Sequence, residues 1–196
     1  MTINEFENYI KEKDKKHIIF DFDGTICKLL IDWSDWKKEL EEIVAEYDLG
    51  VSGTEAGLYE IQSICVEKGG QEARTRILEM NYRIEKEYCA GFELLPVALP
   101  VLEVAKKWAQ LYVWTSNDQR TIMPILEELK IEKMFERVVT RNDVDFIKPH
   151  PQGFDLIYDA KNPKSQYLII GDSSADEGAG KNSGIDFLNI TEFELA

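Results

Sequence analysis

The spacing of apolar residues divides the chain into segments of two kinds. At residues 17–22, and again from about residue 96 onward, short apolar runs alternate with amphipathic stretches, which predicts strands separated by helices. The expected strands are 17–22, 111–114, 138–140, 168–170 and 187–190, and the expected helices are 2–12, 101–110, 123–130, 152–159 and 176–182. Apolar strands joined through helices are typical of a parallel sheet covered on both faces. The pattern therefore predicts an α/β fold with a doubly wound, mainly parallel, Rossmann-like sheet.

Residues 34–90 follow a different pattern, in which apolar side chains recur at helical spacing. Three stripes can be traced: Trp36, Leu40, Ile43, Val44 and Tyr47; Leu58, Ile61 and Cys65; Ala73, Ile77, Met80, Ile84 and Tyr88. Glycines at 50–53 and 69–70 separate the stripes, and we see no strand pattern here. We expect an inserted α-helical cap domain at 28–95, with the α/β core formed by 1–27 and 96–196.

Charge and composition narrow the possible functions. The chain has 196 residues, 44% of them hydrophobic, which is enough for one core and a small second domain. Its 23 basic and 37 acidic residues give a formal charge of −14. Such a surplus of acid argues against binding to nucleic acid or to an anionic membrane, because both need clustered Lys and Arg. We expect no nucleic-acid partner and no membrane partner.

The cysteines and histidines carry little chemical signal. Cys27, Cys65 and Cys89 are odd in number and widely spaced, which supports neither a disulfide framework nor a zinc site. The N-terminus shows no signal-peptide pattern, so we expect a cytoplasmic protein. His17 and His150 have no partner motif, and we expect both to be structural.

The most informative stretch is the apolar run at 17–20 followed by Asp21-Phe22-Asp23-Gly24-Thr25. Residues i and i+2 of a strand point to the same side, so Asp21 and Asp23 would converge where the strand ends. Two close carboxylates repel each other and usually require a metal ion, a shared proton or a catalytic task. A plain turn that uses Asp and Gly for their backbone preferences is the alternative.

Polar residues also follow the other expected strands. Thr115-Ser116-Asn117 comes after the second, and Gly171-Asp172 comes after the fourth, with Asp176 four residues later. Lys148-Pro149 lies in the connection before that fourth strand. Ligands of such sheets bind at the carboxyl ends of the strands. These groups predict a site for a phosphoryl group and a divalent metal.

In this order, the motifs resemble those of the haloacid-dehalogenase superfamily of phosphatases. The resemblance rests on the D-x-D-G-T motif at 21–25, Thr115-Ser116-Asn117, Lys148-Pro149-x-Pro151, and Gly171-Asp172-x-x-x-Asp176. It covers the expected core. It also implies that the helical segment is a mobile cap, which we expect to swing about residues 26–32 and 91–97 and expel water during the reaction.

The resemblance implies a role for each motif residue. Asp21 would be the nucleophile that forms an aspartyl-phosphate, and Asp23 the general acid and base. Mg²⁺ would bind Asp21, Asp172 and the backbone carbonyl of Asp23, with Asp176 binding it directly or orienting its ligands or Lys148. The expected phosphate ligands are Thr115, Ser116, Asn117 and Lys148. For Asn117, stabilising the turn in which it lies is an equally good alternative to binding the substrate.

Substrate identity is left open by the sequence. We expect a small phosphorylated metabolite and a monomeric or homodimeric enzyme. Lys28, Arg74 and Arg76 are candidates to meet a second anionic group, and solvated helix faces are the alternative. An aspartate at position 23 favours phosphate esters over carbon–halogen bonds, since members of the superfamily that cleave the latter lack it.

Three other functions fit part of the pattern. A phosphomutase of the same superfamily would share the motifs but is expected to carry an acid–base group on its cap, where this chain has no histidine. A receiver module that accepts phosphate would place its lysine after all its acidic residues, unlike Lys148 here. A non-catalytic interaction module would not need the complete set of motifs.

Overall fold

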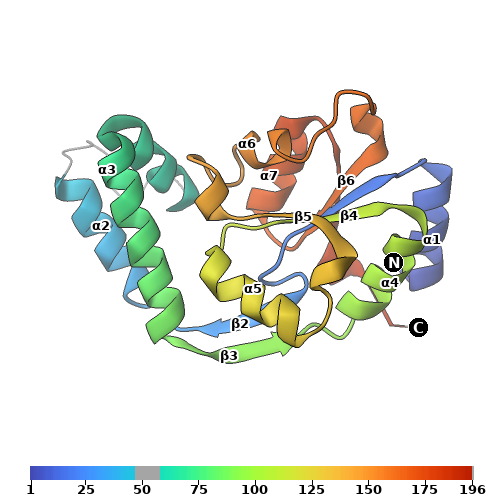
Figure 1. The fold of residues 1–196 in the computed structure, drawn as a ribbon, viewed down its shortest axis with the longest axis horizontal. Helices are drawn as coiled ribbons and strands as arrows, with labels where there is room; N and C mark the ends of the chain where they lie inside the picture. The colour runs from blue at the N-terminus through green and yellow to red at the C-terminus, as the bar shows by residue number, and fades with distance from the viewer. Residues whose placement is uncertain (47–57, 196) are drawn as a thin grey trace.

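The computed structural model describes residues 1–46 and 58–195, and its centre is a parallel sheet (Figure 1). The strands lie in the order β5-β4-β1-β6-β7, and every neighbouring pair is parallel. Their bounds are β1 His17–Phe20, β4 Gln110–Trp114, β5 Phe135–Val139, β6 Tyr167–Gly171 and β7 Asp186–Asn189. The predicted α/β class and Rossmann-like sheet are confirmed.

Helices cover both faces of this sheet. One layer consists of α1 (Ile3–Glu12), α4 (Ala98–Trp108) and α5 (Gln119–Glu128), and the other of α6 (Gln152–Asp155) and α7 (Ser174–Ser183). The central strand β1 is buried along its whole length, with Ile18 and Phe20 facing the first layer and Ile19 facing the second. The apolar run that predicted β1 therefore fills two cores at once. Short 3₁₀ turns lie at Glu132–Met134, Arg141–Asp143, Lys164–Gln166 and Ile190–Glu192.

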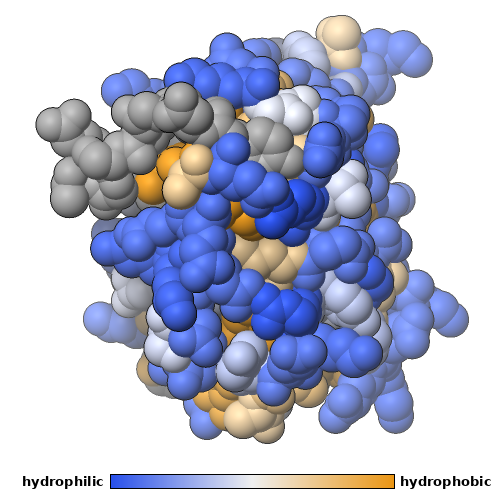
Figure 2. Space-filling model, turned by 90° about the vertical axis from the view of Figure 1, so that its left-hand side faces the viewer, coloured by the Kyte–Doolittle hydropathy of each residue, from blue (hydrophilic) through white to orange (hydrophobic). Residues whose placement is uncertain are grey.

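Two helices form a separate unit at one end of the molecule. These are α2 (Trp36–Glu46) and α3 (Leu58–Glu87), and α3 is interrupted at Gly70, whose φ of 61° and ψ of −151° are not helical. This unit has its own core of Leu40, Ile43, Val44, Ile61, Cys65, Ile77, Met80 and Ile84. Viewed from this end, the surface is mostly hydrophilic, with smaller hydrophobic patches between the hydrophilic residues (Figure 2).

The predicted stripes are largely confirmed where the structure describes them. The break at 69–70 is found at Gly70. The prediction for Tyr88 is wrong, because this residue follows the end of α3 and is 38% exposed. Tyr47, the side chain of Leu58 and the expected break at 50–53 lie outside the described residues.

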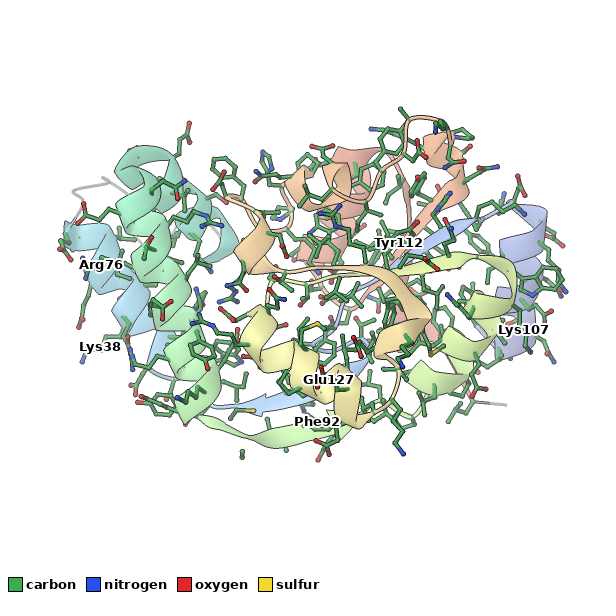
Figure 3. The ribbon with its side chains drawn as sticks, viewed as in Figure 1. Lys38, Arg76, Phe92, Lys107, Tyr112 and Glu127 are labelled. Carbon is green, nitrogen blue, oxygen red and sulfur yellow. The ribbon has the colours of Figure 1, made fainter. Side chains whose placement is uncertain are left out.

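The segment 28–95, expected to be helical, also contains strand residues at both ends, and the second strand begins at Cys89, inside the stretch 34–90 where the sequence shows no strand pattern. β2 (Cys27–Ile31) and β3 (Cys89–Leu94) form an antiparallel ribbon in which Cys27 pairs with Leu94 and Leu29 with Phe92. Phe92 lies on this ribbon and packs, partly buried, against the main core (Figure 3). The two strands of the ribbon are stabilised by pairing with each other, and about sixty residues of chain separate them. Local sequence patterns do not show such long-range pairing. The ribbon connects the sheet to the helical unit.

Three expected helices differ by three or four residues at one end from those observed, and one of them, α5, begins at Gln119 instead of at 123. α4 begins at Ala98, with Pro100 in its first turn, where proline is tolerated because its missing N–H needs no partner. α6 ends at Asp155, four residues before the expected end. None of the described helices combines the length and the apolar character needed to cross a membrane.

Candidate active site

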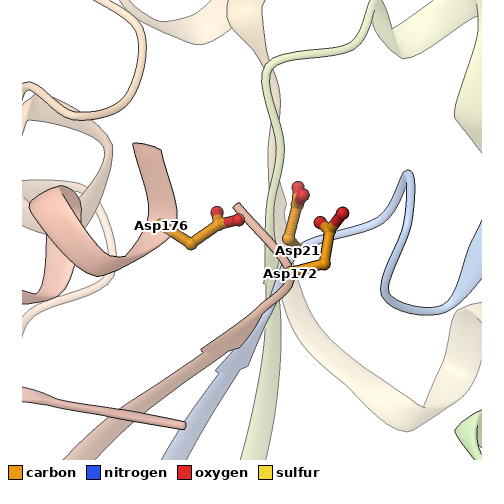
Figure 4. A group of neighbouring side chains, drawn as sticks. All are labelled: Asp21, Asp172 and Asp176. Carbon is orange, nitrogen blue, oxygen red and sulfur yellow. The ribbon is translucent and has the colours of Figure 1, made fainter. Parts of the chain in front are cut away.

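Three aspartates meet at the carboxyl edge of the sheet. Asp21 directly follows β1, Asp172 directly follows β6, and Asp176 lies in the first turn of α7. One carboxylate oxygen from each lies within 4.8 Å of the others. In Figure 4, Asp21 and Asp172 stand side by side at the strand ends, and the carboxylate of Asp176 points toward them from the helix. The predicted convergence of strand ends is therefore found.

Lys148 joins two of these carboxylates. Its Nζ lies 2.7 Å from Oδ1 of Asp21 and 2.5 Å from Oδ1 of Asp176, and its side chain is buried. The other oxygen of Asp176, Oδ2, accepts hydrogen bonds from the backbone N–H and the hydroxyl of Ser173 at 3.1 and 2.6 Å. Both oxygens of Asp176 thus have protein partners, an arrangement suited to positioning Lys148.

Burial dominates the electrostatics of Asp21 and Asp172, whereas at Asp176 burial is outweighed by Lys148 and Ser173, which hold its pKa below the usual value. Burial raises the pKa of Asp21 to about 7, with Asp176 adding to the rise and Lys148 opposing it. Burial and the charge of Asp176 also raise the pKa of Asp172. Burial opposes the charged form of Lys148, but Asp176 and Asp21 hold its pKa above the ordinary value. One ammonium group does not offset three carboxylates, so a second cation would be stabilised here.

The donor set fits Mg²⁺. Carboxylate oxygens are the hard ligands that this ion prefers. The turn after Asp21 also leaves space for Asp172, since Gly24 has a φ of +81° and a Cβ there would lie 2.3 Å from Oδ2 of Asp172. Asp21 and Asp172 are the residues that would hold the ion.

Asp23 lies beside this cluster and differs from it. Its Oδ1 accepts a hydrogen bond of 2.8 Å from the backbone N–H of Leu29 on the ribbon. Burial raises its pKa to about 6, and the charges of Asp172 and Glu85 add to the rise. Asp23 therefore holds a proton at a higher pH than an ordinary aspartate, as a proton donor requires.

The loop after β4 holds the expected phosphate ligands. Ser116 and Asn117 line a cavity together with Lys148, whereas Thr115 is buried beneath them. The hydroxyl of Thr115 donates to Oδ1 of Asn117 at 2.8 Å, and the backbone N–H of Asn117 donates back to that hydroxyl at 3.1 Å. The side chain of Asn117 thus stabilises its own turn, and the binding of phosphate by Thr115 stays a prediction.

The cavity has a volume of about 610 Å³ and lies between the sheet edge and the helical unit. Its walls consist of Asp21, Asp23, Gly24, Lys28, Leu29, Ile31, Trp33, Trp36, Gln62, Asn81, Ser116, Asn117, Arg141, Lys148, Asp172, Ser173 and Ala175. Sequence reasoning did not assign Trp33, Gln62, Asn81 or Arg141 to a site. Arg141 could have been predicted from the sequence, because this residue directly follows an expected strand and so lies at the same edge of the sheet.

The three basic residues proposed for a second anion have different surroundings. Lys28 lines the cavity. Arg74 instead contacts the loop after β5, where its Nη2 donates to the carbonyls of Asn142 and Val144 at 3.0 and 2.8 Å. Arg76 is exposed at the outer end of the helical unit and pairs with Glu46 (Figure 3). Of the three, only Lys28 is among the cavity residues.

The parallel sheet, the helical insertion and the aspartate–lysine cluster at the carboxyl edge of the sheet define a capped enzyme with a Rossmann-like core. The family model of haloacid dehalogenase-like hydrolases matches residues 18–190. The chain belongs to this family, and it is a hydrolase of the phosphatase kind, as the resemblance predicted.

Similar proteins agree with this assignment. The chain is 25% identical over 195 residues to a phosphoglycolate phosphatase from Pseudomonas syringae pv. syringae, covering 92% of this chain and 71% of the relative. The structure of a haloacid dehalogenase-like hydrolase from Bacteroides fragilis superimposes with a TM-score of 0.62 at 21% identity, covering 88% of this chain and 86% of the other. The magnesium-bound hydrolase YfnB from Bacillus subtilis has a TM-score of 0.52 at 19% identity, covering 88% and 85%.

Proposed function

We propose that this protein is a Mg²⁺-dependent phosphatase that hydrolyses a small phosphate monoester through a phosphoryl–Asp21 intermediate. The contact of Lys148 with Asp21, at the wall of a cavity that also contains Asp23, carries this proposal. It supplies a nucleophile, a cation for the phosphoryl group and a proton donor in one place. The names of the Pseudomonas phosphatase and of magnesium-bound YfnB support it.

In the first step, a carboxylate oxygen of Asp21 attacks phosphorus. An O–P bond forms while the bond from phosphorus to the leaving oxygen breaks, and Asp23 gives its proton to that oxygen. The charge of Lys148 reduces the repulsion between Asp21 and the phosphoryl oxygens. The backbone N–H of Ser116 adds a further donor to those oxygens.

In the second step, Asp23 acts as a base. It takes a proton from a water molecule whose oxygen attacks the phosphorus of phosphoryl–Asp21, so that the O–P bond breaks and inorganic phosphate leaves. Both aspartates then return to their starting state. A Mg²⁺ ion held by Asp21 and Asp172 would add positive charge that offsets the repulsion between the nucleophile and the phosphoryl group.

Hydrolysis fits this chain better than transfer of the phosphoryl group back to a sugar. The two histidines, His17 and His150, both lie outside residues 28–95 and are not among the cavity residues. His17 stacks on Tyr167, with ring centroids 4.3 Å apart, in the core.

We also place the enzyme in a reducing, cytoplasmic setting, since Cys27, Cys65 and Cys89 are free thiols.

The test is the release of phosphate from a panel of phosphate monoesters, with Mg²⁺ and then with a chelator. We expect turnover only with Mg²⁺. Asp21→Asn should remove turnover with the fold preserved, while the exposed Asp35→Asn serves as the control and should retain it. Persistent turnover by Asp21→Asn would show that another residue is the nucleophile.

The intermediate can be tested separately by acid quenching during turnover of a ³²P-labelled ester. We expect label on the wild-type protein at Asp21 and none on Asp21→Asn. If the wild-type protein turns over without label at Asp21, the two-step route is contradicted even though a phosphatase activity remains.

A further inference from the structure

The wall of the cavity opposite Asp21 is built by the ribbon and by the helices α2 and α3. Leu29 and Ile31 come from the ribbon, Trp36 from α2, and Gln62 and Asn81 from α3, while Trp33 lies just before α2. None of these six side chains carries a charge. With Lys28, also on the ribbon, as its one cation among the described residues, the part of the cavity that would receive the leaving group is therefore mostly uncharged and partly aromatic.

Hydrogen bonds hold this wall in place. Nε1 of Trp36 donates to Oδ1 of Asn81 at 2.7 Å, and Nδ2 of Asn81 donates to the carbonyl of Ile77 at 2.8 Å and to Oε1 of Gln62 at 3.3 Å. Asn81 is fully buried. The rings of Trp33 and Trp36 stand edge to face, with centroids 6.1 Å apart. Such a fixed aromatic pair is a surface for a flat group.

Two of the three cations among the described cavity residues, Arg141 and Lys148, have acidic partners. Arg141 lies at the cavity with its Nη2 3.3 Å from Oε1 of Glu85, a buried carboxylate of α3. Lys148 contacts Asp21 and Asp176. Lys28 is exposed and lies near Asp23, whose pKa its charge lowers. A carboxylate on the leaving group would thus have to compete with Glu85 for Arg141 or with Asp23 for the exposed Lys28, so an uncharged leaving group is favoured here.

The size of the cavity points the same way. Cavities of about 300–1,000 Å³ are typical for ligands of drug size, and this one has about 610 Å³. A two-carbon leaving group would leave the indole rings of Trp33 and Trp36 uncovered.

We infer that the substrate is a phosphate monoester of an uncharged alcohol that carries a ring, with the ring held against Trp33 and Trp36. This inference rests on the proposed function, because it assigns the leaving-group side of the same site. The inferred substrate differs from the one in the name of the Pseudomonas relative, because phosphoglycolate is the phosphate ester of a small two-carbon acid with a charged carboxylate.

Four esters separate the effects of the ring and the charge. Benzyl phosphate has a neutral ring, 4-carboxybenzyl phosphate a charged ring, 2-hydroxyethyl phosphate a small neutral group, and 2-phosphoglycolate a small charged group. We expect kcat/KM for benzyl phosphate to exceed that for 2-hydroxyethyl phosphate by about 10-fold or more. The added carboxylate should lower kcat/KM within each pair.

Variants assign the preference to the wall. Trp33→Leu and Trp36→Leu should each reduce the ratio of kcat/KM between benzyl and 2-hydroxyethyl phosphate toward one. Trp108→Leu is the matched control, because Trp108 is exposed on α4 outside the cavity, and its ratio should equal that of the wild type. If a cavity variant fails to fold, calorimetric binding of benzylphosphonate against methylphosphonate to the wild type gives the same comparison.

The outcomes are distinguishable. Preference for 2-phosphoglycolate over benzyl phosphate, or an unchanged ratio in folded Trp33→Leu and Trp36→Leu, would overturn the inference and leave the phosphatase proposal intact. Equal binding of the two phosphonates would also overturn it. Absence of turnover with all four esters and the wider panel would overturn the proposed function itself.

Discussion

The ammonium nitrogen of Lys148 lies 2.7 Å from Oδ1 of Asp21, and both side chains are buried. The two groups come from distant parts of the chain, one at the end of the central strand and the other from the loop before α6. Buried ions of opposite charge stabilise each other only while both are present. The contact therefore links the stability of the core to the chemistry of the nucleophile.

Lys148→Met should be costly for this reason. Removal of the ammonium leaves Asp21 and Asp176 buried without their cation, and we expect a loss of about 3–5 kcal/mol in the free energy of unfolding, measured in urea at pH 7.5 without metal. The rate of ester hydrolysis should fall by about 100-fold or more, as for other donors to a developing charge.

Lys16→Met is the control for this prediction. Lys16 pairs with Asp14 at 2.8 Å, but both side chains are more than half exposed, so the expected loss is at most about 1 kcal/mol. Equally small losses in the two variants would show that Lys148 and Asp21 are not an interdependent pair.

Asp23→Asn should change how the rate depends on the leaving group. Burial, helped by Asp172 and Glu85, raises the pKa of Asp23 to about 6, and the protonated form is the one that donates. Saturating Mg²⁺ would favour the ionised form of Asp21, so for wild-type enzyme with an alkyl ester under that condition kcat/KM should fall as the pH rises above about 6. The variant should lose most of its activity on that ester and retain more on 2,4-dinitrophenyl phosphate, whose leaving group needs no proton. Stopped-flow assays across pH 5–8 would measure both, and an equal loss on the two esters would contradict the role of donor.

Gly24→Ala should weaken the metal site. The new Cβ would lie 2.3 Å from Oδ2 of Asp172, and the φ of +81° is unfavourable for alanine. We expect the Mg²⁺ concentration at half-maximal activity to rise by about 10-fold or more. Gly70→Ala is the matched control, since Gly70 also has a positive φ (+61°) but a Cβ there meets nothing within 4 Å. It should lower stability without changing the Mg²⁺ requirement, and a shift of the same size in both variants would speak against a role for Asp172 in the metal site.

The sheet edge could be predicted from the sequence because its signals are local. An apolar run ending in Asp21, and another ending in Gly171 and Asp172, each indicate a strand and the polar group that follows it. In a parallel sheet these ends share one edge, so the position of Lys148 near Asp21 followed from topology together with the family resemblance. The aromatic and apolar stripes likewise located the helical unit.

The remainder depends on contacts between distant segments. The ribbon pairs Cys27 with Leu94, and neither strand is long or alternating enough to be recognised alone. The cavity wall combines Trp36 with Asn81 across the two helices, and at the helical spacing of its sequence stripe Trp36 looks like an ordinary core residue. The sequence made Arg74 a candidate to bind a second anionic group of the substrate. In the structure its side chain instead contacts the core at Val144, a long-range contact that no local pattern indicates.

The contacts of Arg74 with the loop after β5 hold the helical unit against the core. Nη2 of Arg74 donates to the carbonyls of Asn142 and Val144, and its Nε lies 2.9 Å from Oδ1 of Asp145. Charged hydrogen bonds of this kind contribute about 1.5–3 kcal/mol each. Arg74→Ala should therefore favour an open arrangement, lower kcat/KM by about 10-fold or more, and speed hydrogen exchange around 142–145.

Arg76→Ala is the control, because Arg76 lies two residues further along the same helix and pairs with Glu46 on the outer face of the helical unit. It should leave both kcat/KM and the exchange of 142–145 at wild-type values. Because Arg74 is not among the residues that line the main cavity, an effect of its replacement on kcat/KM would have to act through the position of the helical unit. Faster exchange with unchanged kcat/KM would mean that this contact stabilises the fold but does not control closure of the helical unit over the site. Other contacts would then have to hold the helical unit in the closed position.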